Sequence, residues 1–157
     1  MADSNRLQNV TIHWSYPIIL ENIDTLWKNK QFGIYYISRV FNGTESPIYI
    51  GETKRDFITR INEHYKTVSD FFNKRGLKKI RLGTIVKPQT LSSYKEDDKE
   101  IKHLLQVIES RLVEYLFNNN YGKTLCNKRQ VGSYSEWYKV NIENIGFRGS
   151  LPKYIPY

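Results

Sequence analysis

The sequence predicts an α+β fold, with a small three-stranded, mainly antiparallel sheet that is made of an N-terminal hairpin plus one strand and is flanked by helices. Two apolar stretches joined by a turn predict the hairpin, and a third stretch rich in β-branched residues predicts the last strand. Two segments with apolar residues at helical spacing predict the main helices. At 157 residues, the chain is expected to form one domain.

The hairpin is predicted between residues 32 and 51. The segments 32–41 (FGIYYISRVF) and 47–51 (PIYIG) are rich in β-branched and aromatic residues, as strands are. Between them, Asn42-Gly43 is a turn signal typical of tight hairpins. A further strand is predicted over 79–86 (KIRLGTIV), and Pro88 ends it.

Helices are predicted on both sides of that third strand. Thr53 and Asp56 resemble a capping box, and apolar residues at helical spacing then continue toward Gly76. After a polar loop over 91–98, a long helix is predicted over 99–118, with a buried stripe of Ile101, Leu104, Leu105, Ile108, Leu112 and Leu116. A short helix through Ile23, Leu26 and Trp27 is also predicted, whereas the tail 128–157 receives no assignment.

Composition narrows the class of protein. The formal net charge is +8, which favours a polyanionic partner, although charge alone is a weak signal. The single cysteine, Cys126, excludes an internal disulfide, and one cysteine with three histidines gives no zinc-ligand spacing. No apolar run is long enough to span a bilayer, and the first residues lack a secretory pattern, so we expect no membrane association and a cytoplasmic location.

Two tripeptides of the predicted hairpin point to a family. Gly33-Ile34-Tyr35 and Tyr49-Ile50-Gly51 resemble, letter for letter, the motifs of the GIY-YIG nuclease superfamily, which includes homing, repair and restriction endonucleases. The resemblance covers residues 32–128 and leaves 1–31 as an N-terminal extension and 129–157 as a basic, aromatic C-terminal extension of the same domain. It implies a metal-dependent DNA endonuclease, and the short flanks favour a restriction-type or mobile-element enzyme.

The resemblance also implies catalytic residues beyond Tyr35 and Tyr49. The family carries an arginine on the helix after the second tripeptide, often with His or Tyr one turn later, and here Arg60 and His64 match. A solvated arginine on a basic helix is the alternative for Arg60. An asparagine closes the family's core, and Leu125-Cys126-Asn127 supplies it.

A glutamate on the later helix completes the set that the resemblance implies. Glu109 and Glu114 are the two candidates, and helical geometry separates them. At about 100° per residue, Glu109 falls beside the buried stripe, whereas Glu114 falls on the solvent side. Glu109 is therefore the expected metal ligand; an ion pair with Lys102 or Arg111 is its alternative role.

Further residues are expected to contact nucleic acid. Gly33 and Gly51 allow close backbone approach beside the site, and three cations complete the set: Lys54, Lys128 and Arg129. Some relatives carry a lysine directly after the second tripeptide, where this chain has Glu52. Either Lys54 substitutes for that lysine or the contact is absent.

The implied chemistry is phosphodiester hydrolysis at one Mg²⁺ (or Mn²⁺) bound by Glu109. The sequence offers no second acidic partner, so a single ion is expected. Arg60 would donate to the phosphoryl oxygens, and either Tyr35 or Tyr49 would accept the proton of the attacking water. His64 would orient a tyrosine or water, or bind phosphate.

Double-stranded DNA is the expected partner, and a homodimer is a further expectation, because aromatic residues in the flanks could contact bases, a second subunit or the sheet itself. A nucleic-acid-binding module that keeps the fold without cleavage is the main alternative. A basic interaction protein that matches the motifs by chance is the third.

Overall fold

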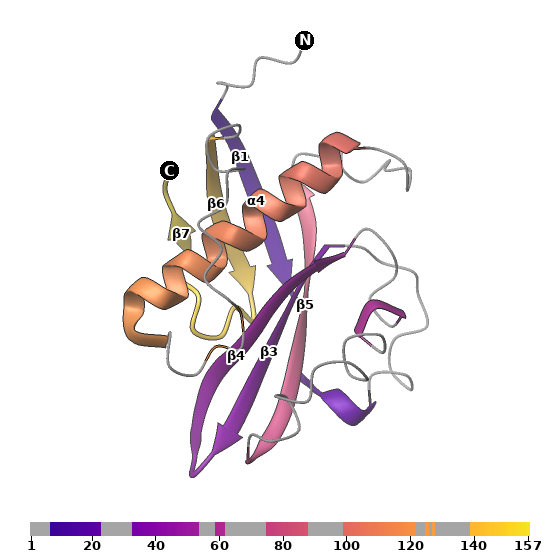
Figure 1. Cartoon of the computed structure of the whole chain (residues 1–157), viewed down its shortest axis with the longest axis vertical. Helices are drawn as coiled ribbons and strands as arrows, with labels where there is room; N and C mark the ends of the chain where they lie inside the picture. The colour runs from indigo at the N-terminus through magenta and orange to yellow at the C-terminus, as the bar shows by residue number, and fades with distance from the viewer. Residues whose placement is uncertain are drawn as a thin grey trace.

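The computed structural model describes residues 7–22, 33–53, 59–61, 75–87, 99–121, 125, 127 and 139–157. Within these residues the chain forms one seven-stranded sheet and one long α-helix, α4 (Figure 1). The strands and the helix have these bounds: β1 Leu7–Trp14, β2 Ile18–Ile19, β3 Gly33–Phe41, β4 Thr44–Thr53, β5 Leu77–Lys87, α4 Lys99–Leu116, β6 Lys139–Gly146 and β7 Tyr154–Ile155. Short helical turns, η1 (Leu20–Asn22) and η3 (Phe117–Tyr121), follow β2 and α4.

The sheet has the strand order β4-β3-β5-β1-β6-β7, and β2 pairs with β5. The pairing of β1 with β6 is parallel, and the other described pairings are antiparallel. The predicted hairpin is confirmed as β3 and β4, whose turn places Asn42 and Gly43 at φ 51° and 76°. Both values belong to the left-handed region that such two-residue turns require. The predicted third strand is confirmed as β5.

The predicted fold class, a small three-stranded sheet flanked by helices, is wrong. The three expected strands are present, but the sheet continues through β1, β6 and β7 into a curled, mixed sheet of seven strands. Of the helix predicted from residue 53 to 76, the structure describes residues 59–61, which are helical. The short helix predicted through Ile23, Leu26 and Trp27 lies outside the described residues, as does the polar loop over 91–98.

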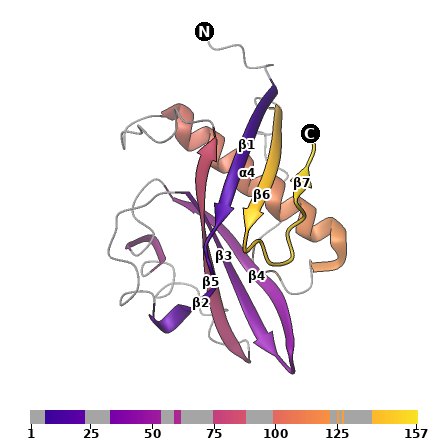
Figure 2. The ribbon, with the colours of Figure 1, turned by 180° about the vertical axis from the view of Figure 1, so that it is seen from behind.

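Strands β1 and β6 are among the elements that the prediction missed, and Figure 2, seen from the side turned away from α4, shows them side by side. The two strands lie about 130 residues apart in the sequence, and no local pattern predicts their parallel pairing. The apolar alternation of β6 also breaks at Asn144, which is 1% exposed. Its Oδ1 accepts from Trp14 Nε1 at 2.8 Å, and its Nδ2 donates to the Pro152 carbonyl at 2.9 Å. A satisfied polar residue thus occupies a core position.

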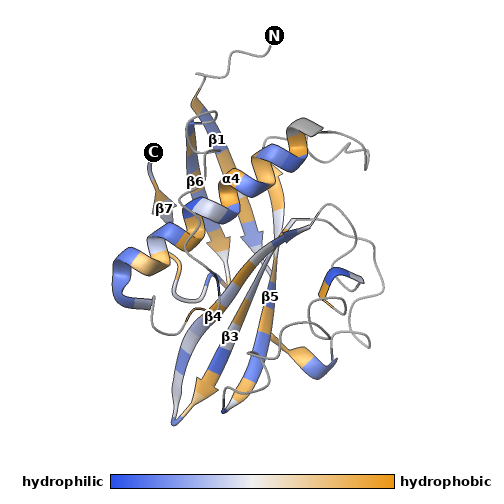
Figure 3. Cartoon of the chain, in the orientation of Figure 1, coloured by the Kyte–Doolittle hydropathy of each residue, from blue (hydrophilic) through white to orange (hydrophobic). Residues whose placement is uncertain are grey.

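Helix α4 covers one face of the sheet and shows alternating apolar and polar surfaces (Figure 3). Its predicted stripe is confirmed, because all six of its residues are buried: Ile101, Leu104, Leu105, Ile108, Leu112 and Leu116. They pack against residues of β1, β3, β4 and β6 in the larger core. The helix ends at η3, where Asn120 adopts φ 72°. No helix in the described part of the chain is both long and apolar enough to cross a membrane.

A second, smaller core lies on the opposite face of β3, β4 and β5. Alternate β3 residues divide between the two cores: Ile34 and Tyr36 belong to the larger one, and Tyr35 and Ile37 to the smaller one. A register shift in β4 near Ile48 adds one residue to this edge strand, as a β-bulge does. The hairpin therefore carries side chains into both cores.

A buried cation, Arg81, connects β3, β4 and β5 on the face that belongs to the larger core. Arg81 of β5 is 6% exposed; it forms an ion pair with Glu45, and its guanidinium lies 5.2 Å from the ring centroid of Tyr36. Ser38 Oγ also donates to Glu45 at 2.7 Å. Burial alone would raise the pKa of Glu45, but the hydrogen bonds from Arg81 and Ser38 outweigh burial and lower it. The network ties β4 to β5 across β3.

Candidate active site

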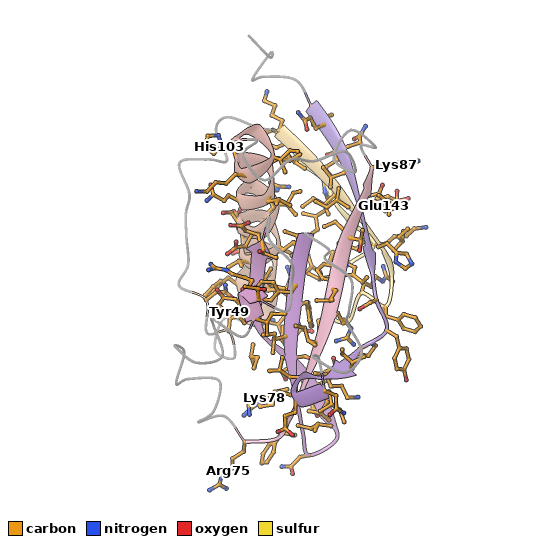
Figure 4. The ribbon with its side chains drawn as sticks, turned by 90° about the vertical axis from the view of Figure 1, so that its right-hand side faces the viewer. Tyr49, Arg75, Lys78, Lys87, His103 and Glu143 are labelled. Atoms are coloured by element: carbon orange, nitrogen blue, oxygen red, sulfur yellow. The ribbon has the colours of Figure 1, made fainter. Side chains whose placement is uncertain are left out.

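The hairpin positions the two motif tyrosines on one face. Tyr35 lies opposite Gly51, and Tyr49 lies opposite Ile37, so the two tyrosines are diagonal neighbours across β3 and β4. Their rings stack with centroids 5.8 Å apart and planes at 24°. Tyr35 is fully buried, whereas Tyr49 is only partly buried at the β4 edge (Figure 4).

Gly51 is required by the position of Tyr35. A Cβ at residue 51 would lie 2.0 Å from Tyr35 Cζ and 2.2 Å from its hydroxyl oxygen. Such distances are far below van der Waals contact, so the Tyr35 ring occupies the space that any larger residue would need. Gly33 begins β3 opposite Thr53 and is buried. The second glycine of the motif therefore has a direct packing role beside the tyrosines.

The predicted residues from three separate segments meet at one pocket. The pocket has a volume of about 220 Å³ and is lined by Tyr35, Tyr49, Glu52, Arg60, Gln106, Glu109 and Ser110. The two tyrosines come from the hairpin, Arg60 from the helical residues 59–61, and Glu109 from α4. The sequence had predicted these four residues as one site, and the structure brings them together. Glu114, the other candidate for the glutamate of the site, is exposed.

The pocket straddles the edge strand. Glu52 pairs with Ile34 of the larger core, so its side chain projects on the face that α4 covers, whereas Tyr49 packs against the smaller core on the other face. Gln106, Glu109 and Ser110 share one surface of α4, because residues three and four apart are neighbours on a helix. Side chains from both faces of β4 therefore reach the same volume.

Charges in the pocket act on one another strongly. Burial and, to a smaller extent, the neighbouring Glu52 carboxylate raise the pKa of Glu109, Arg60 opposes the rise, and the net value is about 8. Burial also raises the pKa of Tyr49, and the charge of Glu109 adds to that rise. A protonated or metal-bound Glu109 is thus favoured over a bare carboxylate.

The two tyrosine hydroxyls are not equivalent. Burial raises the pKa of both residues, but their mutual hydrogen bond raises the pKa of Tyr35 and lowers that of Tyr49. When Tyr49 is ionised, its oxygen can only accept this hydrogen bond, and Tyr35 is then the donor. Arg60 lowers the pKa of both. Tyr49, the more exposed of the two, is therefore better able to carry a negative charge.

The donor set fits a hard divalent cation. Two carboxylates, Glu52 and Glu109, line the pocket together with Gln106, whose buried Oε1 has no hydrogen-bond partner among the described residues. Carboxylate and amide oxygens are ligands that Mg²⁺ and Mn²⁺ accept. No group of three or more His, Cys, Asp and Glu side chains with metal-binding geometry occurs in the described part of the chain. A mixed set of oxygen donors is thus what the pocket offers.

Asn127 lies beside the site and not in its lining. Its Nδ2 donates to the Ile50 carbonyl at 2.8 Å, and its Oδ1 accepts from the Ile50 amide at 2.9 Å. The side chain thus pairs with the edge of β4 as a neighbouring strand would, at the residue between Tyr49 and Gly51. The family resemblance implies a catalytic role for Asn127, whereas its contacts with Ile50 support a role in positioning the hairpin.

Asn127→Ala is expected to lower the free energy of unfolding by about 1–2 kcal/mol, because two backbone groups of Ile50 lose this partner. Amide hydrogen exchange at Ile50 should become faster, which NMR can measure. Asn118→Ala, an exposed residue beyond α4, is the matched control and should leave that exchange rate unchanged. An unchanged Ile50 exchange rate in Asn127→Ala would contradict the positioning role.

The remaining predicted residues lie outside the described residues: His64, Lys54, Lys128 and Arg129. Sequence reasoning missed Gln106 and Ser110 as lining residues and did not assign Glu52 to the pocket. Helical spacing could have found the first two, since Gln106 lies three residues before Glu109 and four before Ser110, and residues at those spacings are neighbours on a helix. Comparison of the chain with protein-family models, curated proteins and solved structures finds no match.

Proposed function

We propose that this chain is a divalent-metal-dependent endonuclease that hydrolyses phosphodiester bonds in DNA. The observation that carries the proposal is the meeting of Tyr35, Tyr49, Arg60 and Glu109 from three segments at one pocket. A tyrosine pair, a guanidinium and a half-buried carboxylate are the groups that the GIY-YIG resemblance implied.

Cations along the same face support a polyanionic substrate. Arg39 follows Tyr35 and Ile37 on alternate positions of β3, so all three point to one side of the sheet, and Lys78 lies directly opposite Arg39. Four residues of strand separate Tyr35 from Arg39 by about 13 Å. Lys78 and Arg75 extend from the lower end of the sheet in Figure 4. These side chains could bind phosphates flanking the cleaved one.

Each pocket residue has a role in the proposed hydrolysis. Arg60 donates to the nonbridging oxygens of the phosphate as negative charge grows on them. The Tyr49 oxygen, as tyrosinate, takes a proton from water; the water oxygen forms a bond to phosphorus, and the bond to the 3′ oxygen breaks. Tyr35 donates a hydrogen bond that stabilises the Tyr49 tyrosinate. A divalent ion held at Glu109 would, when bound, polarise the phosphate and stabilise the leaving oxygen.

The metal and the base are coupled through Glu109. The carboxylate charge of Glu109 raises the pKa of Tyr49, so a cation that neutralises Glu109 removes that effect and favours the tyrosinate. Cleavage should therefore accelerate as pH rises, by about tenfold per unit below the pKa of the base. We assign the base role to Tyr49 because it is the more exposed of the two tyrosines, and the supporting role to Tyr35.

Plasmid cleavage with Mg²⁺ or Mn²⁺ tests the proposal. We expect nicking or linearisation that EDTA abolishes, and a loss of about 10²–10⁴-fold in Tyr49→Phe because its base is gone. Tyr35→Phe should lose about tenfold, since only a supporting hydrogen bond is removed. Tyr16→Phe, an exposed tyrosine, is the control. DNA binding without any cleavage would favour a non-catalytic binding module, and a larger loss in Tyr35→Phe would reverse the two roles.

A further inference from the structure

We infer that Glu52 is a second carboxylate ligand of the divalent ion, so that the ion is bound between β4 and α4 instead of at Glu109 alone. This inference rests on the proposed function and deepens it. It also replaces the expectation that the chain offers no second acidic partner for the ion.

The position of Glu52 supports the assignment. It directly follows Gly51 near the end of β4, projects on the face that α4 covers, and lines the same pocket as Glu109. Both side chains are half-buried. Two half-buried carboxylates that line one pocket repel each other, and a divalent cation bound by both would relieve that repulsion.

The side-chain oxygen of Gln106 also supports a metal ion in this pocket. Gln106 lies one turn before Glu109 on α4, and its buried Oε1 has no hydrogen-bond partner among the described residues. An amide oxygen is an acceptor that a metal ion or a metal-bound water would satisfy. Glu52, Glu109 and Gln106, from β4 and from one surface of α4, thus line one pocket.

The charge balance of the pocket agrees with this assignment. With both glutamates ionised and Arg60 protonated, the lining carries one net negative charge. A divalent ion and one phosphodiester together add one positive charge, so the loaded site is neutral before a tyrosine ionises. The negative lining therefore favours binding of a divalent cation.

Titration calorimetry with Mn²⁺ alone, on the full chain without DNA, tests the inference. We expect Glu52→Gln to weaken Mn²⁺ binding about tenfold or more while the protein stays folded by circular dichroism. Gln106→Leu should weaken it less, since the lost ligand is neutral. Glu114→Gln removes the same charge from an exposed position on α4 and should bind as the wild type does.

The outcomes separate this inference from the proposed function. Wild-type protein that binds Mn²⁺ and cuts DNA, together with Glu52→Gln that binds Mn²⁺ within twofold of wild type, would overturn the role of Glu52 alone. Wild-type protein that neither binds Mn²⁺ nor cuts DNA would overturn both. A tenfold loss of affinity in Glu52→Gln, with Glu114→Gln unchanged, supports the assignment independently of any cleavage assay.

Discussion

Glu109→Gln is expected to abolish cleavage and, at the same time, to stabilise the metal-free protein at neutral and alkaline pH. Burial, together with Glu52, raises the pKa of Glu109 from an ordinary value near 4.5 to about 8 in the folded state. A raised folded pKa contributes stability that is fully present below the unfolded pKa and is lost as pH rises through about 8. Glutamine resembles the protonated acid and does not lose its proton.

The gain from Glu109→Gln should be on the order of 2–3 kcal/mol at pH 7. Urea denaturation in EDTA at pH 4.5, 7 and 8.5 measures it, and the difference from wild type should vanish at the lowest pH. Glu114→Gln, at an exposed position, should show no such pH dependence. A Glu109→Gln protein that is less stable than wild type at every pH would contradict the environment described for Glu109.

Added metal should reverse the order of stability. A ligand that binds only the folded state stabilises it by RT ln(1 + [L]/Kd), so the gain grows with the logarithm of its concentration over its dissociation constant. Saturating Mn²⁺ should therefore raise the melting temperature of the wild type and leave that of Glu109→Gln almost unchanged. The ionised Glu109 therefore destabilises the metal-free protein, and the same charge is what binds the metal.

The sequence predicted the site better than the fold, and the reason is physical. Tyr35, Tyr49 and Glu109 lie on elements whose patterns are local: a hairpin with a turn signal and a helix with a six-residue stripe. Local patterns fix which way a side chain points. The prediction that these elements meet at one site came from the family resemblance, because no spacing along the chain indicates that they meet.

Glu52 and the outer strands show where such reasoning ends. Strict alternation places Glu52 on the opposite face of β4 from Tyr49 and Gly51, so sequence alone separates it from the tyrosines. Only the packing of α4 against the edge strand brings both faces to one pocket. In the same way, the parallel pairing of β1 with β6 depends on contacts between distant segments, which periodicity does not reveal.

Gly51→Ala is expected to damage the site through a single methyl group. That Cβ would lie 2.0 Å from Tyr35 Cζ, and the Tyr35 ring cannot move away freely because it is fully buried and stacked on Tyr49. Forcing a methyl group into a packed core costs about 1–3 kcal/mol. A displacement of the tyrosines by about 1 Å should slow cleavage about a hundredfold. Urea denaturation and single-turnover cleavage measure the two effects.

A double variant separates this clash from any general intolerance of alanine at residue 51. Tyr35→Ala removes the ring that the new methyl group would meet, so adding Gly51→Ala to it should cost little further stability. The two changes should then be strongly non-additive, by about 1 kcal/mol or more, as expected for residues in contact. Strict additivity would mean that Gly51 acts through the backbone and not through Tyr35. Because residue 51 is not among the positive-φ positions, an alanine there meets no backbone strain, and the clash remains the cause to be measured.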